Sequence, residues 1–206
     1  MAIIAFVPGN WAKLGGLLAL WFLTFRRLSK AEWILYVGAC CFFTVMNTLS
    51  LRQGIFAFTA PDVLGMPVYE LFMWGFYLLH VKRVVNGPAP QAPPLQVWSA
   101  WILALLYAVA FSTIADSNTL LAVTAALLLF GIFLFHERFD LLYTGYMVLL
   151  GAAFEYTGVL SGQWAYPGNP PGGVPLWFIT LWGGVGLFLR RLLLPLLNPE
   201  VQRPLY

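Results

Sequence analysis

Long apolar stretches with almost no charge are the feature that most constrains what this chain can fold into. A helix needs about 20 mainly apolar residues to cross a bilayer. Reading between the charged residues and the Pro/Gly clusters gives seven such segments, roughly 4–25, 31–51, 66–85, 95–115, 117–135, 139–160 and 174–197. The sequence therefore predicts an all-α polytopic transmembrane bundle of about seven helices, forming a single domain over residues 1–206.

The scarcity of charge excludes several classes of protein. The 206 residues include 11 basic and 8 acidic side chains, and 61% of the chain is hydrophobic. About a quarter of the residues of an ordinary soluble domain are charged. A water-soluble globule, a disordered chain and a nucleic-acid-binding protein are therefore excluded. Cys40 and Cys41 are adjacent, so they frame neither a disulfide scaffold nor a zinc site.

The distribution of basic residues predicts an orientation. With the N-terminus outside, nine basic residues fall on the inner side and two, Lys13 and Arg52, on the outer side. The nine are Arg26, Arg27, Lys30, Lys82, Arg83, Arg138, Arg190, Arg191 and Arg203. Because cytoplasmic loops carry an excess of Lys and Arg, we expect a multi-pass protein of the cell (inner) membrane with its C-terminus in the cytoplasm.

Only two acids, Glu70 and Glu155, lie clearly inside the predicted helices rather than at their ends. Ionisable side chains inside a span are costly and usually face the protein interior. Both fall roughly 6–8 Å below the outer boundary at about 1.5 Å per residue, which suggests a shared cavity. Asp62, in the loop before Pro67, is placed at its mouth. The other residues expected to line this chamber are Asn47, Trp74, Tyr77, Trp164, Tyr166, Trp177 and Trp182.

Structural roles are also open for each acid. Glu155 could hold helices together by bonding Asn47 or a backbone carbonyl. Glu70 could be an interfacial acid stabilised by a helix N-terminus. Asp62 could serve as a loop or helix-cap acid.

Several enzyme classes lack their ligands in this sequence. Two histidines are too few for a di-iron site, no H-E-x-x-H motif is present, and the last helix has no lysine for retinal. We therefore expect no metal and no cofactor. Acid chemistry on an apolar alkene remains possible, because a buried carboxyl can donate a proton and aromatic faces can stabilise the resulting carbocation.

The segment 151–182 carries Glu155, Gly158, Gly162, Trp164 and Tyr166, then Gly173, Pro175 and Trp182. This pattern resembles the membrane-integral carotenoid-biosynthesis proteins of the hydratase type. The segment 65–74, "GMPVYELFMW", is similar to the P-x-x-E segments of small membrane lycopene and meroterpenoid cyclases, although Leu71 follows Glu70 where those proteins often have a second Glu. The resemblance implies cofactor-free protonation of an isoprenoid double bond, with Glu155 as the acid and Glu70 as its partner acid or base.

Two functions follow from these observations. The first is a membrane-embedded enzyme that cyclises or hydrates a carotenoid or other isoprenoid. The alternative is a non-catalytic lipid- or pigment-binding protein, or an accessory subunit of a larger membrane complex. Either function implies an apolar isoprenoid or lipid partner within the membrane and no nucleic acid, and protein partners stay open. A carboxylate-based transporter is a weaker third hypothesis, because no inverted repeat is visible.

Overall fold

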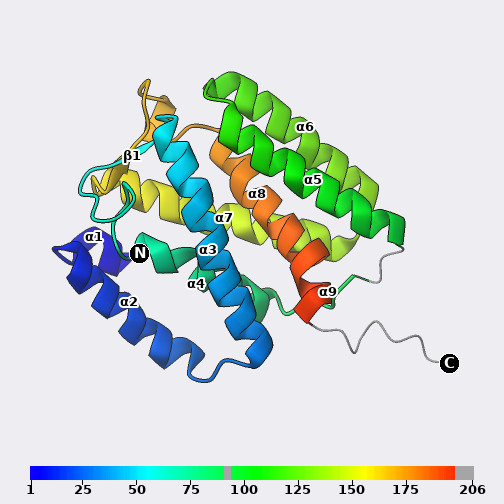
Figure 1. Cartoon of the computed structure of the whole chain (residues 1–206), viewed down its shortest axis with the longest axis horizontal. Coiled ribbons are helices and arrows are strands. Elements are labelled where there is room, and N and C mark those ends of the chain that lie inside the picture. The colour runs from blue at the N-terminus through cyan, green and yellow to red at the C-terminus, as the bar shows by residue number, and fades with distance from the viewer. Residues whose placement is uncertain (91–93, 198–206) are drawn as a thin grey trace. The chain divides into compact units, whose positions relative to one another are not determined.

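The computed structural model describes residues 1–90 and 94–197, and most of these residues are helical (Figure 1). The chain divides into two compact units. Unit 1 contains residues 1–79 and 152–175, and unit 2 contains residues 80–151 and the chain from 176 onward. Helices α4 and α7 contribute residues to both units. The prediction of a single domain stays a prediction.

Unit 1 begins with a helix that is broken early. Its elements are α1 (Ala2–Phe6), α2 (Asn10–Phe25), α3 (Lys30–Arg52), β1 (Ala57–Phe58), the start of α4 (Glu70–Val85), the end of α7 (Arg138–Leu160), β2 (Trp164–Ala165) and a 3₁₀ turn at Pro171–Gly173. Pro8, which has no backbone N–H, falls between α1 and α2, and Gly9 precedes α2 with φ of 76°. The predicted segment 4–25 is therefore two helices.

Helix α3 is a single long helix with a strong start. The Ser29 side chain accepts a hydrogen bond from the Glu32 backbone N–H, and the Glu32 carboxylate accepts one from the Ser29 N–H. This capping box satisfies two donors that a helix N-terminus otherwise leaves unpaired. It fixes the beginning of a 23-residue helix at Lys30, one residue from the predicted boundary.

Aromatic rings fill the space between α2, α3 and α4. The Trp21 and Tyr36 rings stack with centroids 5.1 Å apart, and Phe76 meets both rings edge-on. Gly75 makes this packing possible, because a Cβ there would overlap the Tyr36 ring. These contacts fix the position of α4, and therefore of Glu70, within unit 1.

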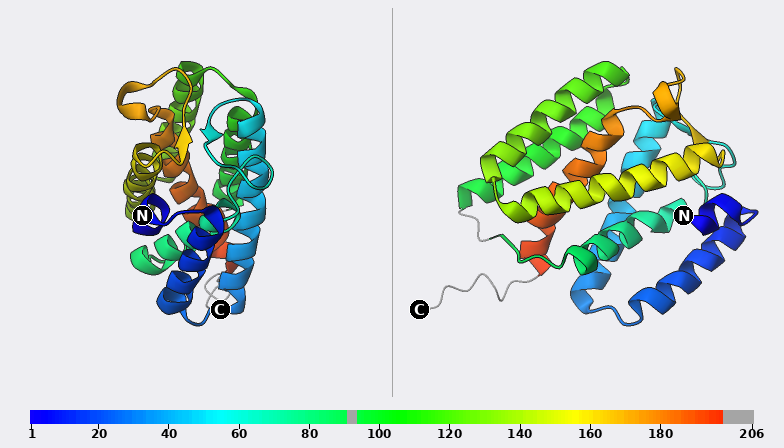
Figure 2. Two further views of the ribbon diagram at one scale, coloured as in Figure 1. Left: turned by 90° about the vertical axis from the view of Figure 1, so that its left-hand side faces the viewer. Right: turned by 180° about the vertical axis from the view of Figure 1, so that it is seen from behind.

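A short antiparallel pair joins two distant loops of unit 1. Strand β1 follows α3 and strand β2 follows α7, and Phe58 pairs with Trp164 across them (Figure 2). The Thr59 N–H extends the pairing by donating to the Gln163 carbonyl at 2.9 Å. The pair places the residues after α7 beside the residues after α3.

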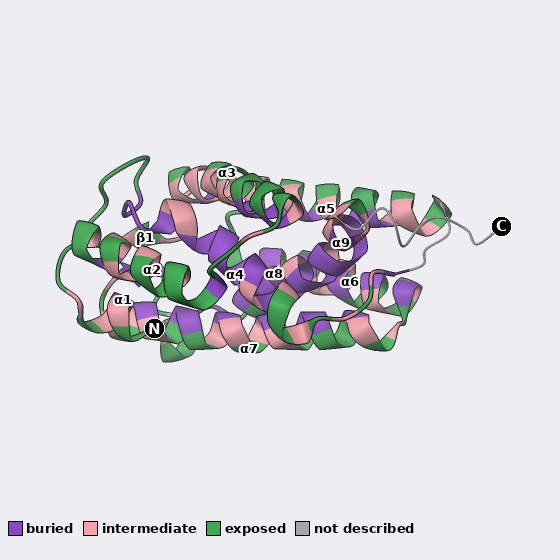
Figure 3. Ribbon diagram, turned by 90° about the horizontal axis from the view of Figure 1, so that it is seen from below, coloured by how far each residue is buried: buried purple, intermediate pink, exposed green. Residues whose placement is uncertain are grey.

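Unit 2 is built around a buried helix. Its elements are the end of α4, α5 (Pro94–Thr113), α6 (Ser117–Phe135), the start of α7, α8 (Trp177–Phe188), a π-helical turn at Leu189–Leu193, and α9 (Leu194–Leu197). Most of α8 is buried (Figure 3). A Cβ at Gly184 would lie 2.6 Å from the Tyr107 ring, and a Cβ at Gly186 would overlap the Tyr143 backbone. These glycines let the neighbouring helices approach α8 closely.

Four helical stretches of the described chain are long and apolar enough to cross a bilayer. They are Lys30–Arg52, Leu95–Thr113, Ser117–Phe135 and Pro171–Leu197. Helices α2 and α4 have 16 residues each, fewer than the ~20 that a straight crossing needs. The fold is a helical membrane fold, and the count of seven spans and their orientation stay predictions.

Candidate functional site

Glu70 is the first residue of α4 and is 6% exposed. Its Oε1 accepts a hydrogen bond from the Asn47 Nδ2 at 3.3 Å, which connects α4 to α3. Its Oε2 is buried and has no hydrogen-bond partner among the described residues. An unsatisfied buried polar atom costs roughly 1–3 kcal/mol, so this oxygen is available to a ligand that donates a hydrogen bond.

Glu155, near the end of α7, has a different environment in the same unit. Its Oε2 accepts hydrogen bonds from the Trp164 Nε1 at 3.1 Å and from the Tyr166 hydroxyl at 2.6 Å. Gly158, one turn further along α7, leaves room for the Trp164 ring, which a Cβ would overlap. Helix α7 therefore packs closely at Gly158 against the segment that supplies both donors.

Two tyrosine hydroxyls feel the charge of both carboxyls. The Tyr166 hydroxyl is affected most by Glu155 and less by Glu70, and both acids also act on the Tyr77 hydroxyl. Burial raises the pKa of the Tyr166 hydroxyl well above its usual range, and the nearby acids raise it further. Tyr166 therefore keeps its proton and acts as a hydrogen-bond donor.

A continuous series of aromatic rings lies beside the acids within unit 1. Trp74 stacks on Phe43 at 3.9 Å between centroids and meets Tyr77 edge-on. Tyr77 in turn contacts Phe154 at 4.8 Å, and Phe154 contacts Trp164 at 5.1 Å. Four of the predicted lining residues, Asn47, Trp74, Tyr77 and Trp164, are thus brought together, and Tyr166 joins them through Glu155.

Three of the predicted residues lie elsewhere. Asp62 is exposed, and its Oδ2 accepts hydrogen bonds from the Asn10 Nδ2 at 2.8 Å and the Val68 N–H at 3.0 Å. It thus holds the turn that leads into α4, which matches the structural role left open for it. Trp177 and Trp182 are buried in unit 2, where Trp177 meets Phe111 edge-on and Trp182 packs on Gly151.

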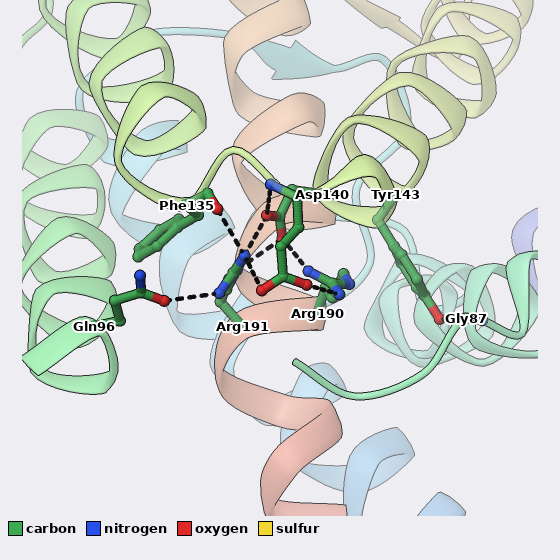
Figure 4. Close-up of polar contacts among 8 residues, drawn as sticks. Gly87, Gln96, Phe135, Asp140, Tyr143, Arg190 and Arg191 are labelled. Carbon is green, nitrogen blue, oxygen red and sulfur yellow. Dashed lines mark hydrogen bonds and ion pairs between the residues drawn. The ribbon is translucent and has the colours of Figure 1, made fainter. Parts of the chain in front are cut away.

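Sequence reasoning missed a buried ion cluster in unit 2 (Figure 4). Arg190 and Arg191, on the π-helical turn, bond both Asp140 and Glu137. Arg191 also donates to the Phe135 carbonyl and to Gln96. The cluster pairs two positive with two negative side chains, so their formal charges balance. In the sequence, the sign of this cluster is a pair of adjacent arginines within the apolar segment 174–197, which the positive-inside rule places on the inner side.

Metal chemistry has no support in the described part of the chain. No group of three or more His, Cys, Asp or Glu side chains lies close enough there to hold a metal ion. The acids of unit 1 instead contact an amide, an indole N–H and a phenol. Such a site presents carboxyl oxygens as hydrogen-bond acceptors among aromatic rings.

The structure is similar to solved structures of one protein, and the sequence gives no comparable match. No protein-family model matches the chain, and no characterised protein matches it by sequence. Two crystal structures of MvINS, a mycobacterial Insig homolog from Mycobacterium vanbaalenii, are similar in fold. A cross-linked trimer of an MvINS variant superimposes with a TM-score of 0.70, and MvINS itself with 0.62. Each has 16% identity and covers 87% of this chain and 99% of the MvINS chain.

The chain is therefore an integral membrane protein with an Insig-like fold. The resemblance to carotenoid hydratases and to lycopene or meroterpenoid cyclases is wrong, because the structural neighbours are Insig homologs. The residues that suggested it have a local explanation. Gly158 makes room for Trp164, and Trp164 and Tyr166 bond Glu155, so the pattern describes how the α7–β2 connection packs. Carotenoid biosynthesis and cyclase, lyase or isomerase activity have no support from the fold.

Proposed function

We propose that this protein is a non-catalytic membrane protein that binds an uncharged amphipathic lipid at the acid and aromatic cluster of unit 1. The observation that carries the proposal is the Glu70 carboxyl, whose Oε1 is held by Asn47 and whose Oε2 has no partner among the described residues. A lipid hydroxyl that donates to this oxygen would satisfy it, with a gain of about 1.5–3 kcal/mol if the carboxyl is charged.

The surroundings of Glu70 support an uncharged lipid. The Tyr69 hydroxyl, on the adjacent residue, is also buried without a partner in the described chain and offers a second hydrogen bond. Phe43 and Trp74 supply flat apolar surface next to the carboxyl. Asn47 and Phe43 are only half-buried on α3, so this edge of the cluster is partly exposed.

Binding without turnover is favoured over catalysis by the way Glu155 is held. Two donors fix its Oε2 at 2.6 and 3.1 Å, and this arrangement positions the α7–β2 connection. The likeness in fold to an Insig homolog also supports a binding role rather than an enzyme. We place this binding role in the cell (inner) membrane, since the ligand would come from the surrounding lipid.

The proposal is tested with a photoreactive long-chain alcohol and its methyl ether, added to the purified full-length protein in nanodiscs. We expect the alcohol to label unit 1, and the ether, which cannot donate, to label it about tenfold less. Glu70→Leu should lose the preference for the alcohol. Glu70→Gln should keep part of it, because its amide oxygen still accepts.

Asp116→Asn is the matched control, since it removes an exposed carboxyl on unit 2 and should leave labelling unchanged. Equal labelling of wild type and Glu70→Leu would contradict the proposal. So would conversion of an isoprenoid to a released product by the wild-type protein.

A further inference from the structure

A pocket at the N-terminal corner of unit 1 lies outside the acid and aromatic cluster. Its volume is about 460 Å³, within the range of small-molecule sites. It lies where the α1–α2 turn, the residues after β1 and the residues before β2 come together. Its lining residues are Ala5, Phe6, Val7, Pro8, Gly9, Asn10, Lys13, Thr59, Ala60, Pro67, Gly162 and Gln163.

Lys13 is the charged residue of this lining, and it is 5% exposed. Its Nζ donates to the Gln163 Oε1, a neutral acceptor, and lies 5.6 Å from the centroid of the Tyr69 ring. In the described chain no carboxylate pairs with it. A buried charge is costly unless it is paired, so the pocket holds a cation that lacks a counter-ion.

The start of α2 adds to the positive character of the pocket. Gly9 caps the helix without a side chain, so no side-chain acceptor covers the first backbone N–H groups of α2. These groups carry partial positive charge. Gly9 and Gly162 both have positive φ, and nothing lies within 4 Å of a Cβ built on either, so this part of the pocket is open.

Asp62, in the loop after β1, accepts hydrogen bonds from Asn10 and the Val68 N–H. It is not part of the lining. The pocket therefore favours an anion.

The remaining walls indicate an anion that carries an apolar tail. Phe6, Val7, Pro8 and Pro67 give the pocket apolar sides next to Lys13. Phe6 is 84% exposed, and Trp11, on the first turn of α2, is 69% exposed. Exposed aromatic side chains are enriched where a membrane protein meets the lipid head groups. The opening thus lies where a lipid can place its head group inside and its chain outside.

We propose that this pocket binds the anionic head group, phosphate or carboxylate, of a membrane lipid, with Lys13 and the start of α2 as the anion-binding groups. The site is separate from the one at Glu70, and its ligand differs in charge. The protein would therefore recognise an anionic lipid at the N-terminal corner independently of an uncharged lipid at the acid and aromatic cluster.

The test measures binding of phosphatidic acid to the full-length protein in phosphatidylcholine nanodiscs by native mass spectrometry. We expect Lys13→Gln to weaken binding by about tenfold or more, since a hydrogen bond to a charged group is lost. Lys13→Arg should restore most of it, because it keeps the charge. Lys30→Gln removes an exposed lysine at the start of α3 and should bind as wild type.

Two further measurements complete the test. The first distinguishes a lipid head group from free phosphate, and the second uses a variant that keeps Lys13. Inorganic phosphate should compete only weakly, and full displacement by it would overturn the assignment to a lipid. Ala60→Phe fills the pocket without changing Lys13 and should also weaken binding. Wild-type affinity in folded Lys13→Gln, or in Ala60→Phe if Lys13→Gln does not fold, would overturn the proposal. Glu70→Leu should leave this binding unchanged, which distinguishes it from the function proposed above.

Discussion

At the scale of residues, the buried acids Glu70 and Glu155 of unit 1 differ in how their oxygens are satisfied. Glu155 Oε2 has two hydrogen-bond donors from the segment after α7. Glu70 has one donor on Oε1 and none on Oε2 in the described structure. The first arrangement stabilises a connection, whereas the second leaves an acceptor available to a ligand. Glu155 and Glu70 have the same side chain and a similar predicted depth in the membrane, but their contacts differ. We therefore propose a structural role for Glu155 and a ligand-binding role for Glu70.

The contribution of the Glu155 contact can be measured with Tyr166→Phe. This change deletes the donor that lies 2.6 Å from Glu155 Oε2 and keeps the ring. A hydrogen bond contributes about 0.5–1.5 kcal/mol, or about 1.5–3 kcal/mol if the carboxyl is charged, so we expect a loss of about 0.5–3 kcal/mol in the free energy of unfolding. The measurement is unfolding by SDS of the purified protein without added lipid.

Tyr69→Phe is the control for this measurement, because the Tyr69 hydroxyl is buried and has no partner among the described residues. Its removal should be neutral or stabilising. If Tyr166→Phe is as stable as wild type, the bond to Glu155 does not stabilise the fold.

At the scale of elements, helix α7 ends in a tightly packed connection. Trp164, on β2, lies over Gly158 of α7 and pairs through its backbone with Phe58 of β1. The sequence predicted the helix over 139–160 and the structure has it at Arg138–Leu160. The sequence did not predict the strand pair, since two-residue strands give no periodic signal.

The close packing at Gly158 predicts that adding a single methyl group there destabilises the protein. In Gly158→Ala the added methyl would overlap the Trp164 ring, so the ring has to move away from Glu155. Overpacking of this kind costs typically about 1–3 kcal/mol. We expect a lower unfolding temperature together with altered tryptophan fluorescence.

Gly145→Ala, on the exposed side of the same helix, is the matched control. Nothing lies within 4 Å of a Cβ there, so the change should stabilise the protein by about 0.5–1 kcal/mol through helix propensity. Equal stability of the two variants would show that Trp164 does not pack on α7 in this way.

At the scale of the whole molecule, the orientation is inferred from the number of Lys and Arg residues on each side of the membrane. Arg190 and Arg191 pair with Asp140 and Glu137. Acidic residues contribute little to this rule, so nine basic residues still fall on the inner side, against Lys13 and Arg52 outside. One of the nine, Arg203, lies outside the described residues. The orientation with the N-terminus outside stays a prediction.

Reporter fusions test this orientation. Green fluorescent protein fused after Tyr206 should fluoresce, and alkaline phosphatase fused there should be inactive, because that end is predicted to be cytoplasmic. The same reporters fused after Ala60, in the loop after α3, should give the opposite pair of results. A phosphatase-active fusion after Tyr206 would reverse the predicted topology.

The sequence by itself determined that this is a helical membrane protein and that Glu70 and Glu155 are acids well inside its apolar segments. These conclusions depend on hydropathy, which measures how favourably a segment transfers from water into lipid. It is a local property, since each segment is evaluated by itself. Only the tertiary structure decided which residues meet: Asn47 bonds Glu70 rather than Glu155, and Arg190 meets Asp140, 50 residues away in the chain. Hydrogen bonds and ion pairs act over a few ångströms, so they depend on how helices pack, and a hydropathy pattern does not specify that packing.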